Sequence, residues 1–245
     1  MRTAAKHLML VAVAMTVLAG LHISAIAQEP CPCARPDNGA GTVTMPPNCL
    51  EGYLGWLTID TGIVGGTIEV EATWSDFAGV AEIVGGGLGG TQSSFDALMT
   101  MQMTGTGSLA GFSRTLFMPL NGGVIDWGPR DLSDPIQDFP GSAAYLEGDI
   151  FGDPDFDNLS FRTGSTLGLL GTGPTTLTRL GPPGSDFSVD SFFDIAYEID
   201  YVGAPGSVLE GFGGTVERST RFQTCPEGVS PVEEATWGTI KALYR

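Results

Sequence analysis

The sequence predicts an all-β fold, an antiparallel β-sandwich or barrel built from repeated glycine-turn hairpins. Apolar residues recur at every second position in several short runs, which is typical of half-buried strands. The 36 Gly and 16 Pro residues are spread between these runs, where they favour turns. Helical periodicity is nearly absent before residue 230. We therefore expect ten to twelve strands around one shared core.

The first 27 residues have the three parts of a cleaved secretory signal. Arg2 and Lys6 form a basic end, an apolar run follows, and small residues at 25–27 precede Gln28. The apolar run is shorter than the roughly 20 residues that a spanning helix needs. We expect cleavage after Ala27, a secreted or periplasmic protein, and no membrane span in the mature chain.

The strand pattern is clearest in three stretches, 66–74, 94–104 and 190–201. In each of them apolar and polar residues alternate, so that one face is apolar and the other is polar. The apolar faces that we expect to be buried are Ile68, Val70, Ala72 and Trp74; Phe95, Ala97, Met99, Met101 and Met103; and Phe193, Ile195, Tyr197, Ile199 and Tyr201.

A structural unit is repeated within the chain, because residues 94–115 resemble residues 192–215. Each copy has Phe-Asp at the start of a strand, then eight further residues before a glycine, and a Gly-Phe pair further on. Glycine at such points supports tight bends and positive φ angles. The repeat predicts two similar hairpin turns.

The ends of the chain differ in character from its middle. We assign residues 28–50 to a Cys- and Pro-rich segment, 51–229 to the all-β domain and 230–245 to a helical tail. Ser230 and Glu233 form a capping box around Pro231, which predicts a short C-terminal helix. This tail either packs against the β domain or binds an envelope or extracellular partner.

The four cysteines of the chain predict two disulfides in an exported protein. A Cys31–Cys33 bridge would close a very tight ring. We therefore expect Cys225 to be bonded to Cys31, Cys33 or Cys49, which ties the end of the domain to its beginning. A metal site formed by the same four residues is the alternative, although zinc sites usually have wider spacings.

Charge and composition exclude several classes of function. The signal holds two of the 11 basic residues and none of the 28 acidic ones, so the mature formal charge is 9 − 28 = −19. Nucleic acid requires a cationic surface and is not expected as a partner. Both histidines, His7 and His22, lie in the signal. Histidine-based nucleophile activation and histidine-ligated metals are therefore excluded from the mature protein.

Carboxylates, tyrosines and bound ions remain for catalysis, and the specific candidates are carboxylates. The triplet Asp60-Thr61-Gly62 resembles the active-site loop of aspartic proteases, but Ile63 follows where that family has Ala or Ser. Glu198 and Asp200, like Glu69 and Glu71, are two residues apart in predicted strands. Such neighbours are about 7 Å apart, a separation used by inverting glycosidases. The same spacing arises on any polar strand face.

Three aspartates at alternate positions suggest calcium as the one candidate cofactor. Asp153, Asp155 and Asp157 have the spacing of the first ligands in many calcium loops. A later acidic ligand is not evident, and Arg162 follows instead. The alternative interpretation is an acidic turn at the end of a hairpin.

The strings "LAGFSRTLFMPL", "GDPDF", "TTLTRL", "VDSFFDIAYEIDYVGAPG" and "GTV" occur in this order between about residues 40 and 224. This order resembles a family of exported bacterial proteins of unknown function. The resemblance implies an extracytoplasmic all-β domain and carries over no catalytic residue. The ending "TWGTIKALYR" is similar to the C-termini of other secreted bacterial proteins.

Taken together, these patterns favour an exported non-catalytic protein with a structural or binding role in the cell envelope or extracellular space. The alternatives are a carboxylate-based hydrolase, of the aspartic or glycoside type, and a calcium-stabilised adhesion module. Glu198, Asp200 and Asp60 are the candidate site residues for the hydrolase, and Asp153, Asp155 and Asp157 for the adhesion module.

Overall fold

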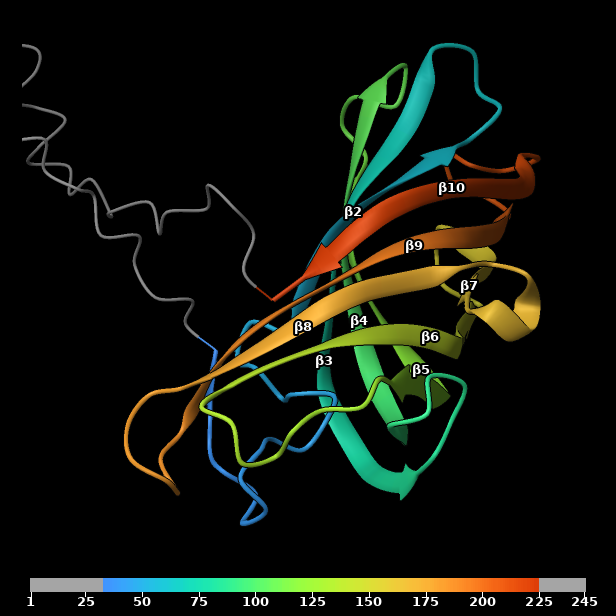
Figure 1. The fold of residues 1–245 in the computed structure, drawn as a ribbon. Coiled ribbons are helices and arrows are strands. Elements are labelled where there is room, and N and C mark those ends of the chain that lie inside the picture. The colour runs from blue at the N-terminus through green and yellow to red at the C-terminus, as the bar shows by residue number, and fades with distance from the viewer. Residues whose placement is uncertain (1–32, 225–245) are drawn as a thin grey trace, which may run out of the picture. The chain divides into compact units, whose positions relative to one another are not determined.

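The computed structural model describes residues 33–224 (Figure 1). The predicted all-β fold is confirmed, because these residues form ten strands and one 3-10 turn. The predicted signal over 1–27 and the helix over 230–245 lie outside the described residues. The elements are β1 (Ala34–Arg35), β2 (Tyr53–Asp60), β3 (Gly66–Val84), β4 (Thr91–Gly107), β5 (Ser113–Trp127), β6 (Ile136–Phe151), β7 (Phe156–Thr163), η1 (Ser165–Leu167), β8 (Gly171–Arg179), β9 (Phe187–Gly203) and β10 (Gly213–Gln223).

The strands form one antiparallel sheet that closes on itself, because the series of paired strands that begins at β9 also ends at β9. The order is β9-β10-β2-β3-β4-β5-β6. Both β7 and β8 then connect β6 to β9, each along a different part of these two long strands. In Figure 1 the strands β6 to β10 lie in front of β3 and β4, so the sheet curls into two layers around the core. The sheet is therefore closed and barrel-like.

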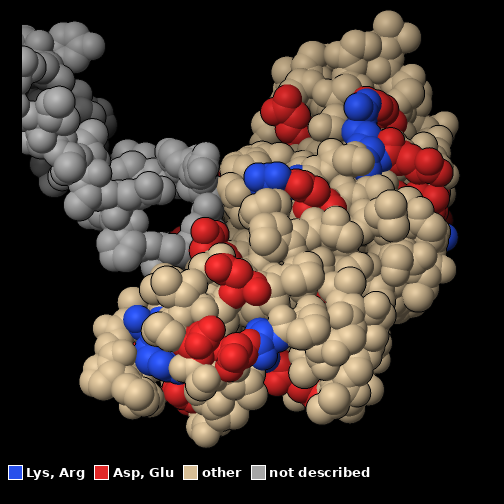
Figure 2. All heavy atoms as spheres, in the orientation of Figure 1, with Lys and Arg blue, Asp and Glu red and all other residues tan. Residues whose placement is uncertain are grey.

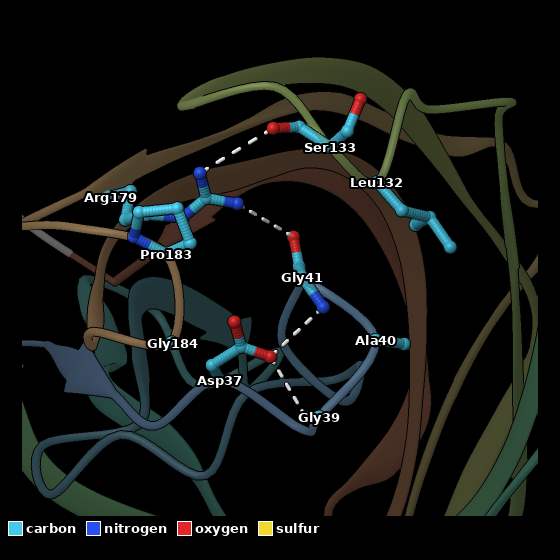
Figure 3. Close-up of a pocket in the computed structure, with 9 residues that line it drawn as sticks. All are labelled: Asp37, Gly39, Ala40, Gly41, Leu132, Ser133, Arg179, Pro183 and Gly184. Carbon is cyan, nitrogen blue, oxygen red and sulfur yellow. Dashed lines mark hydrogen bonds between the residues drawn. The ribbon is translucent and has the colours of Figure 1, made fainter.

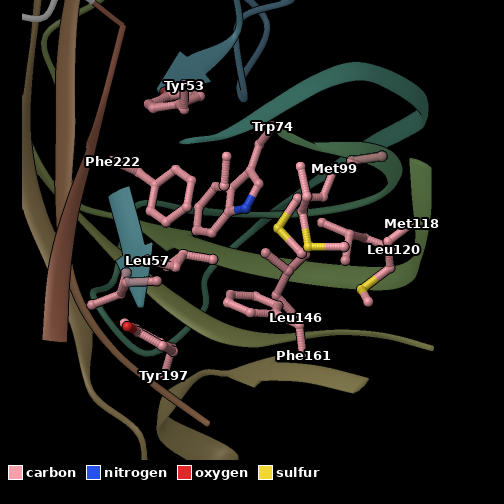
Figure 4. Packing of buried hydrophobic residues seen from close by; sticks show 14 of the residues in the cluster. Tyr53, Leu57, Trp74, Met99, Met118, Leu120, Leu146, Phe161, Tyr197 and Phe222 are labelled. Atoms are coloured by element: carbon pink, nitrogen blue, oxygen red, sulfur yellow. The ribbon is translucent and has the colours of Figure 1, made fainter. Parts of the chain in front are cut away.

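Alternate residues of each long strand fill the space between the layers. In β9 every odd-numbered residue from Phe187 to Gly203 is buried, and the even-numbered residues face outward. All the apolar residues that the three strand patterns place on inner faces are buried. Figure 4 shows aromatic, leucine and methionine side chains meeting in the core. Each large apolar side chain buried in this way contributes roughly 1.5–3 kcal/mol.

The seam between β10 and β2 is closed mainly by side chains. Within residues 33–224, Gln223 and Leu54 are the one pair of residues that faces each other in a backbone ladder between these strands. Beyond that pair, the hydroxyl of Thr220 donates to the carbonyl of Trp56 at 2.6 Å. The amide of Thr58 donates to the hydroxyl of Tyr197 at 3.0 Å. Side-chain hydrogen bonds thus take the place of a continuous ladder along this seam.

The two copies of the internal repeat form equivalent turns, as their sequences predict. The amide of Gly105 donates to the carbonyl of Phe112, and the amide of Gly203 donates to that of Phe212, both at 2.8 Å. In each turn the leucine, Leu109 or Leu209, is buried. The repeated sequence therefore encodes the connections β4–β5 and β9–β10.

The N-terminal segment belongs to the same core as the strands. Val43 and Met45 are buried among the core residues. The hydroxyl of Thr42 donates to the side chain of Gln137 at 2.7 Å, and the Gln137 amide donates to the carbonyl of Gly41 at 2.6 Å. Residues 41–45 thus pack onto the sheet, although the sequence pattern separates residues 28–50 from the all-β domain.

Cys33 and Cys49 form a disulfide within this segment. The expectation that Cys33 does not pair with Cys31 is therefore confirmed. Cys31 and Cys225 lie outside the described residues.

Candidate functional site

The acidic row of β9 lies on the outer face of the sheet. Asp190 and Asp194 are exposed, while Glu198 and Asp200 are half-buried. Arg162 of β7 lies beside the second pair: its guanidinium is 3.3 Å from a carboxylate oxygen of Glu198 and 2.7 Å from one of Asp200. The structure therefore brings the two predicted candidates together around one arginine.

This geometry follows from the register of three strands. Arg162 is directly opposite Glu198, and Glu147 of β6 is directly opposite Arg162. Glu217 of β10 continues the same row beyond Glu198. A glycosidase pair needs space for a sugar and a water between its carboxyl groups. Here the guanidinium occupies the space between the carboxylates, so the arrangement is that of a solvated ionic row.

The ionic row makes this face acidic. Figure 2 shows that acidic atoms outnumber basic ones here, and that the basic groups lie beside acidic ones. At the edge of the row, a hydrogen bond with Glu147 raises the pKa of Tyr145 above its usual value, and burial acts in the same direction.

Asp60 is held at the β10–β2 seam, apart from the pair on β9. It is the last residue of β2, and Arg218 of β10 donates a hydrogen bond to its carboxylate. This bond raises the pKa of the Arg218 guanidinium. The hydroxyl of Tyr201 donates to the carbonyl of Thr61 at 2.5 Å, which anchors the turn that follows. The Asp-Thr-Gly triplet thus forms the β2–β3 turn, with its carboxylate in an ion pair.

The three predicted calcium ligands lie around the β6–β7 turn, and two of them bind an arginine. Arg114 of β5 is 2.5 Å from Asp153 and 3.3 Å from Asp155, whereas Asp157 is exposed in β7. Burial raises the pKa of Asp153, but hydrogen bonds from the Asp155 amide and Arg114 outweigh it, so the net pKa is below its usual value.

Within residues 33–224, no group of three or more acidic, histidine or cysteine side chains is arranged to hold a metal ion. Calcium would therefore have to displace Arg114 and rearrange the turn. The remaining pair, Glu69 and Glu71, is exposed on the outer face of β3.

A hollow of about 600 Å³, which the sequence patterns do not predict, is lined by three separate loops (Figure 3). Arg179 donates to the carbonyls of Ser133 and Gly41, both at 3.4 Å, and its guanidinium lies 5.0 Å from the ring of Phe187. Asp37 accepts the amide hydrogens of Gly39 at 2.8 Å and Gly41 at 3.0 Å. Both charged groups thus hold loop backbone in place, and none of the predicted site residues lines the hollow.

The "DNGAG" string at 37–41 is the one sequence signal for this hollow, because Asp followed by glycines is typical of side-chain-capped turns. The partner loops come from residues 132–133 and 179–184, which nothing in the sequence connects to residue 37.

No protein-family model matches the chain, and neither the curated proteins nor the solved structures contain a significant match. The resemblance to exported bacterial proteins therefore stays a prediction. None of the helices in the described part of the chain has the length and apolar character needed to cross a membrane.

Proposed function

We propose that the chain is an exported, non-catalytic protein with a structural or binding role in the cell envelope or extracellular space. One observation carries this proposal: the candidate carboxylates lie on the outer surface of a closed sheet, bound by arginines or exposed. Glu198 and Asp200 share Arg162, and Asp60 binds Arg218. Catalytic carboxylates are usually gathered in a concave pocket with perturbed pKa values.

Export is supported by two further features. The N-terminal sequence has the plan of a cleaved signal, with the expected site after Ala27. The Cys33–Cys49 disulfide is typical of proteins that fold in an oxidising compartment. A secreted or periplasmic location accounts for both features.

An activity screen tests the non-catalytic role against the hydrolase alternative. Purified protein is incubated with unfolded protein and with polysaccharide substrates between about pH 4 and 7, beside the variants D60N and E198Q/D200N. We expect no turnover that differs between wild type and variants. Turnover abolished by D60N would establish an aspartic-type enzyme, and turnover abolished by E198Q/D200N a glycosidase.

The partner of a binding protein would be an envelope or extracellular component reached through residues 230–245. Capture experiments from the native envelope with the full chain and with residues 28–229 test this role of the tail. We expect partners that require the tail, and identical captured proteins in both cases would reject it.

A further inference from the structure

The two ends of the described chain meet on one edge of strand β9. The amide of Thr224 donates to the carbonyl of Ser191 at 2.9 Å, and the amide of Val189 donates to the carbonyl of Cys33 at 2.9 Å. Backbone groups of residues two apart in a strand point to the same edge. Thr224 and Cys33 therefore lie along the same edge of β9, while β8 pairs along the other.

The direction of the two strands brings the start of β1 and the end of β10 face to face. Both β1 and β10 are antiparallel to β9, and β10 ends where β1 begins. The attachment points, Ser191 and Val189, are two residues apart in β9, which corresponds to about 7 Å. The end of β10 thus points toward the start of β1.

Two cysteines follow directly from these ends in the sequence. Cys225 is the residue after Thr224, and Cys31 is two residues before Cys33. Each residue extends the chain by at most ~3.5 Å, and a disulfide requires Cα atoms about 4.4–6.8 Å apart. Because Cys33 is already bonded to Cys49, Cys31 is the N-terminal cysteine left for Cys225.

We propose that Cys31 and Cys225 form a second disulfide that joins the two ends of the domain beside β9. Two thiols lose two protons and two electrons as the S–S bond forms. A disulfide-containing oxidant accepts the two electrons and the two protons, and its own S–S bond is reduced to two thiol groups. The bond would enclose all ten strands of the described domain in one covalent loop.

The position of this bond gives it a specific role in the sheet. Gln223, which pairs with Leu54 to join β10 to β2, lies two residues before Cys225 in the chain. A covalent anchor at this point would keep β10 from separating at the seam, where side chains replace the backbone ladder. It would also fix the base of the C-terminal tail to the domain.

Peptide mapping of the oxidised protein tests the proposal independently of its location in the cell. The variant C33A/C49A retains only Cys31 and Cys225, and it is refolded with glutathione disulfide. A protease that cleaves before aspartate separates the fragment ending at Pro36 from the fragment beginning at Asp200. We expect these two fragments to be joined in a monomer with no free thiol.

Two free thiols in this variant, or a bond between two chains, would overturn the proposal. The wild-type protein, which needs no substitution to fold, must likewise show no free thiol in denaturant. The matched variant C31A/C225A keeps Cys33–Cys49 and should melt roughly 10 °C lower than wild type. It should also exchange the amide hydrogen of Thr224 faster, and unchanged exchange would contradict a role at the seam.

Discussion

Phe222 of β10 stacks on Trp74 of β3, with ring centroids 4.0 Å apart and an interplanar angle of 12° (Figure 4). Strand β2 lies between the two strands that carry these rings. The contact is made past Gly55 of β2, where a Cβ atom would lie 2.8 Å from Phe222 Cγ and 2.8 Å from the Arg221 carbonyl oxygen. The missing side chain of Gly55 thus provides the space for the stack.

The variant Gly55→Ala should lower the free energy of unfolding by about 1–3 kcal/mol, because the new methyl group overpacks the seam. Denaturant unfolding measures the loss. In the background of Phe222→Ala the same methyl group has more room, so its cost should be smaller. If Gly55→Ala lowered the free energy of unfolding equally in both backgrounds, Gly55 would not be needed to make room for the Phe222 ring.

Gly203 and Gly105 should be equally intolerant of a side chain in the repeated turns. A Cβ would lie 1.8 Å from the carbonyl oxygen of Leu209 at Gly203, and 2.2 Å from that of Leu109 at Gly105. Either substitution to Ala must move the backbone, and we expect a loss of at least ~1 kcal/mol.

Gly214 in β10 offers the matched control for these turns, since a Cβ there would meet nothing within 4 Å. Gly214→Ala should be neutral or stabilising by up to about 1 kcal/mol. Thermal unfolding of the three variants measures this contrast. Similar losses at all three positions would contradict the close approach in the turns.

The ion pair of Asp194 and Arg221 should make stability depend on acidic pH. Two hydrogen bonds of 2.7 and 2.8 Å from Arg221 lower the pKa of Asp194. A lowered folded-state pKa contributes stability above the unfolded value of about 3.9, and this is lost as pH falls through the folded value. Both side chains are about half exposed, so the contribution is a few tenths of a kcal/mol.

Measurements of unfolding free energy for wild type and Asp194→Asn at about pH 6 and pH 2 test this sign. The advantage of the wild type should be present at the higher pH and absent at the lower one. An advantage that grows on acidification would show that the pKa of Asp194 is not lowered.

Calcium should leave the wild-type protein unchanged at millimolar concentration, because Arg114 already binds Asp153 and Asp155. Calorimetry and thermal unfolding with calcium measure this, with Arg114→Gln as the variant in which both carboxylates are released. Heat and a raised melting temperature in wild type, abolished by D153N/D155N, would instead support the calcium-stabilised adhesion module.

The strand interiors could be predicted from the sequence because alternation is a local property. The odd-numbered residues of β9 are buried as their apolar pattern indicates, and Glu198 and Asp200 face outward with the polar positions. The repeated turns could be predicted for the same reason, since a glycine turn depends on neighbouring residues.

The ion pairs could not be predicted, because they depend on which strands become neighbours. Arg162 is 36 positions from Glu198 in the sequence, and the register of β7 on β9 places them opposite each other. The hollow around Arg179 depends in the same way on loops distant in the chain.

By itself, the sequence determined the all-β class, the buried strand faces, the repeated turns and the histidine chemistry that residues 28–245, which contain no histidine, cannot perform. The tertiary structure decided that the sheet closes at a side-chain seam, that Arg162 binds Glu198 and Asp200, and that Cys33 and Thr224 lie on one edge of β9. The physical reason is the distance along the chain over which each property is set. Backbone conformation and amphipathic patterning depend on adjacent residues, whereas strand register and side-chain pairing result from packing between distant segments of the domain.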